Sequence, residues 1–358
     1  MPPKVSVVMS VYNGERYLRE AVNSILDQTF TDFEFIIVND GSIDNTCAIL
    51  ESYNDSRIVL IHNQENIGLT RSLNKGLTLA QGEYVARMDA DDVAIPHRFE
   101  KQVAFLEKHP EIGILGSSCW TIDTNGQGQG VYQMPTNDLQ IRWTSLLANP
   151  FVHPTVMIRR DLLIQNGLKY DEAFQTTQDY ELWMRVLKYT RGANLSEPLI
   201  RYRVRYGITS KHRQAQLRNH DTIALRTIQE QLPEFVITLE QVSQLRSLFV
   251  GGGEFTPVSC SQYVALASLY LDMFENFLGR HPGEPCLKAL QHKEALKVAH
   301  ILLHIPIKSG SARLLKRLLT MYPGLPWSSI VHLLKASSRR FRRLLNFGVR
   351  QYRHWRNH

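Results

Sequence analysis

The chain has 358 residues, of which 43% are hydrophobic and 21% are charged. This composition excludes disordered, collagen-like and low-complexity proteins, and the length suggests one large domain with an appendage. The net charge of +7 is unevenly distributed: the segment from Ala295 to His358 carries thirteen Lys or Arg and no Asp or Glu. The rest of the chain carries 28 basic and 34 acidic side chains. A mildly acidic body with a basic tail predicts an anionic partner for the tail, and the confinement of the charge to the tail disfavours a nucleic-acid-binding protein.

The four cysteines lie far apart and form no Cys-x-x-Cys pair, so free thiols in a reducing cytoplasm are expected. A strand-like run follows Met1-Pro-Pro-Lys directly, which argues against a signal peptide. The two longest uncharged stretches, 255–271 and 318–334, have 17 residues each and contain Pro and polar groups. A membrane-spanning helix needs about 20 mostly apolar residues. We therefore expect a cytoplasmic protein.

Short apolar strands alternate with helical segments over the first 108 residues. We predict strands at 5–12, 33–38, 58–62 and 84–88, and helices at 18–26, 45–53, 69–80 and 96–108. This alternation predicts βαβ units and an α/β fold with a mostly parallel central sheet flanked by helices. Ligands of such sheets bind beyond the carboxyl ends of the strands. Polar clusters follow all four strands, so we expect them to meet at one edge.

The pattern changes after about residue 112. Strands are predicted at 112–123 and 130–134 as a hairpin, helices at 139–147 and 178–189, and a strand at 198–204. From about residue 213 only helical periodicity remains. We therefore predict a catalytic domain at 1–212 and a helical extension at 213–358.

The most informative motif is Arg87-Met-Asp89-Ala-Asp91-Asp92, which follows the fourth predicted strand. Three carboxylates within four residues repel one another, and a divalent cation offsets this repulsion. Mg²⁺ and Mn²⁺ prefer carboxylate oxygens together with substrate phosphates. A solvated acidic turn is the alternative interpretation, and the position at a strand end favours the cation site.

Two further clusters follow the second and third strands. Asp40, in Val-Asn-Asp-Gly-Ser, is able to accept hydrogen bonds from a base or a ribose hydroxyl, or to cap a turn. Asn66 and Gly68 precede a helix that carries Arg71. A helix N-terminus with a nearby Arg suits a phosphate, and an ordinary glycine-containing helix start is the alternative.

The segment Gln178-Asp-Tyr-Glu-Leu-Trp begins an amphipathic helix. Asp179 lies in its first turn, where the helix dipole favours a carboxylate, so its role is either catalytic or simple capping. Glu181 is expected on a different face of that helix. His153 and His212 are further polar candidates, although an isolated His is more often structural or exposed.

In this order these motifs resemble the family 2 glycosyltransferases with a GT-A fold, the fold of nucleotide-diphospho-sugar transferases. The resemblance covers about residues 4–210 and rests on five motifs in register, at 5–13, 37–42, 66–68, 89–92 and 179–183. It implies an inverting transfer of a sugar from a nucleotide-diphosphate donor to an acceptor hydroxyl in polysaccharide or cell-surface glycan synthesis, and we expect the donor to be UDP-linked. It does not cover the helical extension.

The resemblance also implies roles for individual residues. Asp179 would be the catalytic base, and Asp91, together with Asp89, would hold a divalent cation, Mn²⁺ or Mg²⁺, on the diphosphate. The side chains and glycine expected around the nucleotide sugar are Ser10, Tyr12, Glu15, Asp40, Asn66, Gly68, Arg71, Arg87 and Asp89.

Two positions depart from the family pattern. Gln178 stands where the family often has Glu, which removes a charge but leaves Asp179. Arg205 stands where relatives often carry a His. A His role in metal or phosphate binding would therefore fall to His212, or Arg205 would contact the phosphate.

The C-terminal segment predicts a second interaction. Within 337–353, apolar residues fall near one helical face and six arginines crowd the rest. A basic amphipathic helix favours an anionic membrane surface, so the protein is expected to be peripheral on the cytoplasmic face, with a saccharide or lipid-linked acceptor. A helix packed on the body is the main alternative here. For the whole chain the alternatives are a sugar nucleotidyltransferase and a non-catalytic module that binds nucleotide sugars.

Overall fold

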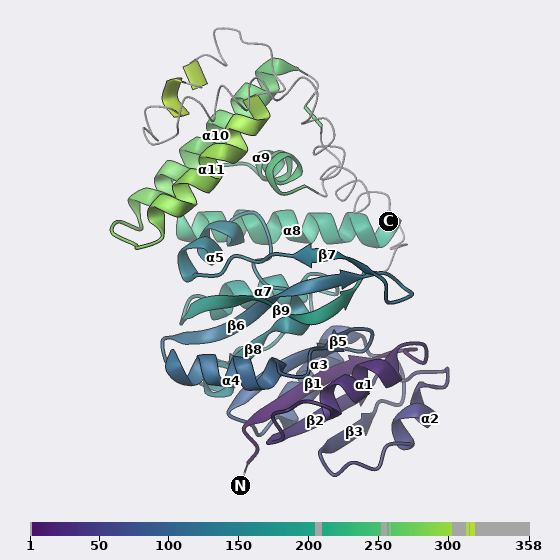
Figure 1. Cartoon of the computed structure of the whole chain (residues 1–358). Helices are drawn as coiled ribbons and strands as arrows, with labels where there is room; N and C mark the ends of the chain where they lie inside the picture. The colour runs from purple at the N-terminus through teal and green to yellow at the C-terminus, as the bar shows by residue number, and fades with distance from the viewer. Residues whose placement is uncertain are drawn as a thin grey trace. The chain divides into compact units, whose positions relative to one another are not determined.

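The computed structural model in Figure 1 describes residues 2–204, 210–251, 256–257, 259–302, 313–314 and 316–318. The chain divides into two compact units. The first unit contains residues 1–144 and 149–205, and the second contains residues 145–148 and 206–358.

The first unit is built on a nine-stranded sheet. Its strands are β1 (Val5–Val11), β2 (Phe33–Asn39), β3 (Ile58–His62), β4 (Tyr84–Asp89), β5 (Val93–Ala94), β6 (Ile112–Ile122), β7 (Gly128–Tyr132), β8 (Met157–Arg159) and β9 (Arg191–Arg203). Its helices are α1 (Leu18–Leu26), α2 (Thr46–Glu51), α3 (Leu69–Leu79), α4 (Arg98–Lys108), α5 (Asp138–Ser145), the 3₁₀ turn η1 (His153–Thr155), α6 (Arg160–Gln165) and α7 (Gln178–Val186).

The strand order is β3-β2-β1-β4-β8-β6-β9-β5, with β7 paired to β6. The first four strands are parallel, as the βαβ alternation predicted, and β6 is parallel to β9. β8 is antiparallel to both of its neighbours, β5 is antiparallel to β9, and β6 and β7 form the predicted antiparallel hairpin. The predicted α/β fold with helices around a central sheet is confirmed.

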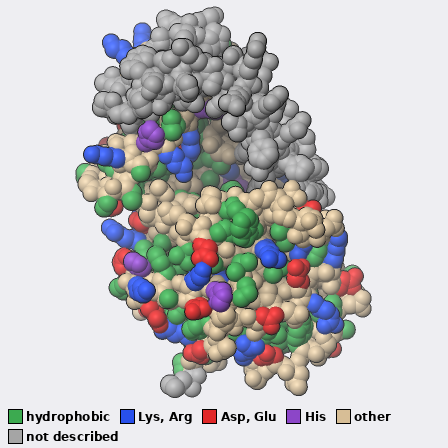
Figure 2. Space-filling model, viewed as in Figure 1, with side chains coloured by type: hydrophobic (Ala, Val, Ile, Leu, Met, Phe, Trp, Pro, Cys, Tyr) green, Lys and Arg blue, Asp and Glu red, His purple; other side chains and the backbone are tan. Residues whose placement is uncertain are grey.

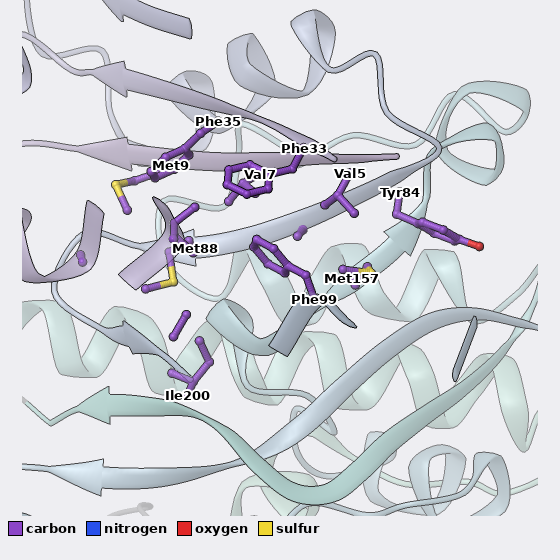
Figure 3. Packing of buried hydrophobic residues seen from close by; sticks show 14 of the residues in the cluster. Val5, Val7, Met9, Phe33, Phe35, Tyr84, Met88, Phe99, Met157 and Ile200 are labelled. Carbon is purple, nitrogen blue, oxygen red and sulfur yellow. The ribbon is translucent and has the colours of Figure 1, made fainter. Parts of the chain in front are cut away.

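The core lies where β1, β2 and β4 pack against α1 and α4. All seven residues of β1 are buried, as expected for a strand covered on both faces. Figure 3 shows alternate residues of β1, such as Val5 and Met9, on the same side as Phe33 of β2 and Phe99 of α4. The Phe33 and Phe99 rings meet edge to face at 5.7 Å. This packing fixes the strand ends on which the polar clusters sit.

Four short elements were not predicted: β5, β8, α6 and η1. Strands of two or three residues are too short to show a period-2 pattern. β9 also begins at Arg191, seven residues before the predicted start, because polar residues and Pro198 break its apolar pattern. On the face of this unit visible in Figure 2, acidic and basic side chains are interspersed.

The second unit is helical. Its described elements are α8 (Ser210–Gln231), α9 (Leu239–Leu245), the π-helical segment η2 (Arg246–Val250), α10 (Cys260–Gly279) and α11 (Leu287–Leu302). Buried polar contacts tie it together: Arg246 bonds Asp221 at 2.6 Å and the Leu147 carbonyl at 2.7 Å. Among the described residues, no helix combines the length and the apolar composition needed to span a membrane. The predicted basic helix at 337–353 lies outside the described residues.

Candidate functional site

The carboxyl ends of β1, β2, β3 and β4 meet at one edge of the sheet, because these four strands run parallel. Ser10 of β1 lies beside Asp89 of β4 in register. Several hydrogen bonds join the loops that follow β1 and β2. The Asn13 amide donates to Ser42 Oγ at 3.0 Å, and Asn45 Nδ2 donates to Glu15 Oε2 at 2.7 Å. The predicted nucleoside residues therefore share one rim, with Tyr12 47% exposed on it.

Asp40 is only 1% exposed and anchors the loop after β3. Its oxygens accept hydrogen bonds from the backbone amides of Ile67 and Gly68, at 2.9 and 3.0 Å, and from Asn63 Nδ2 at 2.9 Å. Gly41 has φ +68°, and a Cβ there would lie 2.4 Å from the Glu65 backbone. The turn after β2 thus needs glycine to pass this closely. Asp40 shapes the Asn66–Gly68 loop, and its contact with a base stays a prediction.

The start of α3 is attached to the segment that leads into α7. Thr70 Oγ1 donates to the Phe174 carbonyl at 2.9 Å, and Asn74 Nδ2 donates to the Tyr170 carbonyl at 2.9 Å. Arg71 is exposed and pairs with Glu172 at 3.1 Å. An exposed ion pair of this kind is weak, so it leaves Arg71 able to change partner. Its predicted contact with phosphate stays a prediction.

The acidic cluster at the end of β4 combines an ion pair with a buried carboxylate. Arg87 Nη2 lies 2.5 Å from Asp89 Oδ1. Asp92 is buried, and its Oδ2 has no hydrogen-bond partner in the described structure. Burial, followed by the charges of Asp89 and Asp91, raises the pKa of Asp92 well above its ordinary value. Carboxylate oxygens are the donors that a hard divalent cation prefers, and as the described residues stand the three carboxylates do not meet within 4.8 Å of one another.

Arg203, at the end of β9, holds the backbone of this acidic loop. Its amide donates to Asp92 Oδ1 at 2.7 Å, and its Nε donates to the Asp91 carbonyl at 2.8 Å. Its Nη2 bonds Glu20 of α1 at 2.7 Å, and its guanidinium lies 4.2 Å from the centre of the Tyr17 ring. A planar, forked donor is suited to joining several acceptors in this way. Arg203 therefore positions the backbone of Asp91 and the carboxylate of Asp92.

A row of buried side chains runs from the end of β4 to α7. Arg87 Nε donates to His153 Nε2 at 3.2 Å, and the Tyr170 hydroxyl lies 2.8 Å from the same nitrogen. Burial, and then the charge of Arg87, lowers the pKa of His153 well below its ordinary value. Both rings pack edge to face on Trp183 of α7, at 5.9 and 6.2 Å. His153 is thus a neutral structural link between the acidic cluster and α7.

Asp179 lies in the first turn of α7, one helical turn before Trp183. Its Oδ2 accepts a hydrogen bond from Asn149 Nδ2 at 2.7 Å, and the side chain is half-buried. Burial raises the pKa of Asp179 to about 6, the charge of Asp89 adds to this, and the backbone amides at the helix start oppose it. Asp179 is therefore close enough to Asp89 for their charges to interact. It is mostly ionised near neutral pH and is a stronger base than an ordinary Asp.

The predicted separation of Asp179 from Glu181 agrees with the structure. Glu181 is buried and pairs with Arg185, one turn further along the helix, at 2.6 Å. Before the helix, Thr177 has φ +63°, a conformation that is costly for a β-branched residue. This strained residue sets the direction in which α7 and its Asp179 leave the preceding loop.

The described structure thus brings Ser10, Asp89, Arg87 and Asp179 toward one edge, with Asp91 on the Arg203-held loop. The side chain of His212 lies outside the described residues. Sequence reasoning missed the positioning residues Arg203, Tyr170 and Asn149. Arg203 falls at the end of the strand predicted at 198–204, and its place at a strand end was the one sequence feature that pointed to it.

Comparison with known proteins agrees with this fold. The profile of the family described as Glycosyl transferase family 2 matches residues 6–167. The O-antigen biosynthesis glycosyltransferase WbnJ of Escherichia coli is 34% identical over 58% of this chain and 82% of its own length. The amylovoran biosynthesis glycosyltransferase AmsE of Erwinia amylovora is 31% identical over 58% of this chain and 79% of its own.

Among solved structures, TarS 1-349 of S. aureus in complex with UDP aligns with a TM-score of 0.52. The alignment covers 90% of this chain and 91% of TarS 1-349, at 20% identity. This similarity shows the fold. The fold and the matching sequences define a glycosyltransferase of the GT-A type. The chain belongs to the family 2 glycosyltransferases.

Proposed function

We propose that this enzyme transfers a sugar from a nucleotide-diphosphate sugar to an acceptor hydroxyl with inversion at the anomeric carbon. The proposal rests above all on Asp179, a half-buried carboxylate with a pKa of about 6. The charge of Asp89 contributes to this pKa, although Asp179 belongs to α7 and Asp89 to β4. A general base of this kind is most effective when its pKa lies near the working pH. Its separation from the acidic cluster leaves one carboxylate for the acceptor and the others for the donor.

In the proposed reaction Asp179 takes the proton of the acceptor hydroxyl while that oxygen attacks the anomeric carbon. A new carbon–oxygen bond forms, the bond from the anomeric carbon to the diphosphate oxygen breaks, and the nucleoside diphosphate leaves with its electron pair. A single displacement inverts the configuration and needs no sugar–enzyme intermediate. Asn149, which donates 2.7 Å to Asp179 Oδ2, fixes the carboxylate so that its other oxygen faces the acceptor.

The acidic cluster fits a divalent cation, Mn²⁺ or Mg²⁺, by its chemistry. Asp89, Asp91 and Asp92 supply oxygen donors, and one buried oxygen of Asp92 has no partner in the described structure. In this proposal Asp91 and Asp89 hold the ion, and Arg203 keeps their backbone in place. A bound cation would neutralise negative charge that develops on the departing diphosphate. Arg87, which reaches Asp89, supports the same negative charge from the protein side.

The donor is proposed to be UDP-linked. Ser10, Tyr12 and Glu15 on the rim would contact the nucleoside, and the Asp40-anchored loop with Asn66 and Gly68 would close over it. TarS, which has the same fold, has been solved with UDP and with UDP-GlcNAc. WbnJ and AmsE are named for O-antigen and amylovoran biosynthesis. We extend this to a role in polysaccharide or cell-surface glycan synthesis, with a saccharide or lipid-linked acceptor.

The proposal is tested with a panel of nucleotide sugars and Mn²⁺. We expect one donor to raise the unfolding temperature selectively and to release nucleoside diphosphate slowly through hydrolysis. Product sugars made with an acceptor should have the anomeric configuration opposite to that of the donor. Release of pyrophosphate would instead identify a nucleotidyltransferase, and binding without any turnover would identify a non-catalytic module.

A further inference from the structure

Three metal-ligating atoms meet away from the acidic cluster. They are Cys47 Sγ and a Glu51 carboxylate oxygen on α2, and a ring nitrogen of His62 at the end of β3, and all lie within 4.8 Å of one another. α2 and β3 are labelled close together in Figure 1. No other group of three His, Cys, Asp or Glu side chains with this geometry occurs among the described residues.

The local structure explains why these residues converge. Cys47 and Glu51 are four residues apart and share one helical face, while α2 turns Ile49 and Leu50 into the core. Strand alternation places His62 on the same face of β3 as Ile58 and Leu60, which pack against that core. His62 therefore projects from β3 toward α2.

The spacing of the three atoms suits a small tetrahedral ion. Cys47 Sγ lies 3.3 Å from Glu51 Oε1 and 3.8 Å from His62 Nδ1. With zinc–ligand bonds of about 2.0–2.3 Å, tetrahedral geometry puts neighbouring ligand atoms about 3.5 Å apart. The two distances from Cys47 Sγ lie close to this value, and the Glu51 oxygen and the His62 nitrogen lie within 4.8 Å of each other.

His62 Nδ1, which lies 3.8 Å from Cys47 Sγ, carries the lone pair of the imidazole ring. Asn39 Oδ1 accepts a hydrogen bond from the Ser42 amide at 3.1 Å, so its other amide atom, Nδ2, lies 3.1 Å from His62 Nδ1. Nδ2 can only donate, hence Nδ1 is the accepting nitrogen. An unprotonated imidazole nitrogen is the form that binds metals. A cation would take the place of the Asn39 amide at this lone pair.

We propose that Cys47, Glu51 and His62 form a second metal site, selective for a thiophilic divalent cation of the Zn²⁺ class and completed by water. A soft sulfur with one nitrogen and one oxygen favours Zn²⁺ over Mg²⁺ or Mn²⁺. The site is separate from the cation on the acidic cluster, and it ties α2 to the strand end beside the turn that carries Asp40.

A partly exposed cysteine also raises the question of a reactive thiol, and its neighbours argue against one. The hydrogen bond to the Glu51 carboxylate raises the pKa of Cys47 above its ordinary value, which disfavours the nucleophilic thiolate. The same carboxylate attracts a cation, and a bound cation reverses the effect by displacing the thiol proton.

The test uses Co²⁺ alone as a spectroscopic substitute for Zn²⁺ on the full-length, reduced protein. We expect a thiolate-to-cobalt charge-transfer band that saturates at one equivalent, bleaches when Zn²⁺ is added and persists with excess Mg²⁺. Cys47→Ser should abolish the band, and His62→Ala should weaken cobalt affinity tenfold or more. Both positions are at least partly exposed, so circular dichroism should show folded variants.

Two control variants make the result specific. Cys260→Ser removes another partly exposed thiol and should leave the band unchanged. Asp91→Asn weakens cation binding at the acidic cluster, which contains no sulfur, and should also leave the band unchanged. Absence of a band in the wild-type protein at millimolar Co²⁺, or a band that survives in Cys47→Ser, would overturn the proposal.

Discussion

Replacing Asp179 with Asn tests the proposed base and its electrostatic environment together. The amide keeps the shape of the side chain, and its oxygen still accepts the 2.7 Å hydrogen bond from Asn149, so the fold and donor binding should persist. The variant has no carboxylate to accept the acceptor proton. Loss of a general base costs about 10²–10⁴-fold in rate, so kcat should fall by that factor while the donor Kd stays within about twofold.

The same substitution should stabilise the metal-free protein at neutral pH. The pKa of Asp179 is about 6 in the folded chain, against 3.8 for an unperturbed Asp. Each pKa unit corresponds to about 1.4 kcal/mol, so ionised Asp179 costs the fold up to about 3 kcal/mol. Above pH 6 the folded and unfolded forms are both ionised and this cost is fully present. It decreases as pH falls from 6 toward 4, because the folded form takes up its proton first.

The assay is thermal unfolding of wild type and Asp179→Asn between pH 4 and 8, with a chelator present. At about 2–4 °C per kcal/mol for a unit of this size, the variant should unfold up to about 6–12 °C higher at pH 8 and at nearly the same temperature at pH 4. Asp161→Asn, an exposed first-turn Asp of α6, is the matched control and should change neither property. Wild-type turnover in Asp179→Asn would refute the base assignment, and a pH-independent difference in unfolding temperature would refute the raised pKa.

Arg203→Ala should lower the free energy of unfolding by about 2–3 kcal/mol, since it breaks a buried charged network. It should also raise the Mn²⁺ concentration needed for turnover. Arg203→Lys lacks the guanidinium fork and should recover neither the stability nor the Mn²⁺ response in full. Asp91→Asn, or chelation of wild type, should reduce transferase activity at least 100-fold, and excess Mn²⁺ should rescue only the chelated wild type. Thr177→Gly should stabilise the fold by about 1 kcal/mol by removing strain at φ +63°, as measured by urea unfolding. Replacing the arginines of 337–353 with Gln should abolish sedimentation with anionic vesicles, and equal pelleting of both proteins would end the membrane prediction.

Local sequence patterns predicted the parallel half of the fold well. β1, β2, β3 and α3 lie within a residue or two of their predicted ranges, because apolar runs of five or more residues carry a clear period. The Asp89–Asp92 cluster was recognisable because its chemistry is contained in four consecutive residues. The parallel strand order then determines which loops share an edge.

Long-range contacts were beyond the reach of these patterns. Arg203 meets Asp91 across a separation of 112 residues, and Asn149 meets Asp179 across 30. Neither Arg203 nor Asn149 belongs to a motif, and a single strand-end Arg or loop Asn has many ordinary roles. The antiparallel strand β8 has three residues and could not be recognised from the sequence pattern either. It pairs with β4 and so places His153, which precedes it, beside Arg87.

Two arginines around the acidic cluster donate hydrogen bonds to backbone carbonyl groups. Arg98 is fully buried, yet its Nη2 donates to the Arg87 carbonyl at 2.9 Å rather than to a carboxylate. Arg203 likewise uses its Nε on the Asp91 carbonyl. These two contacts fix the peptide backbone of the strand end. Burial and the charges of Asp89 and Asp91 raise the pKa of Asp92, so ionised Asp92 costs stability. The same burial leaves Asp92 Oδ2 without a hydrogen-bond partner in the described structure. In the proposed function, a cation that carries the substrate would use such oxygens, so the electrostatic cost and the binding capacity would come from the same side chains.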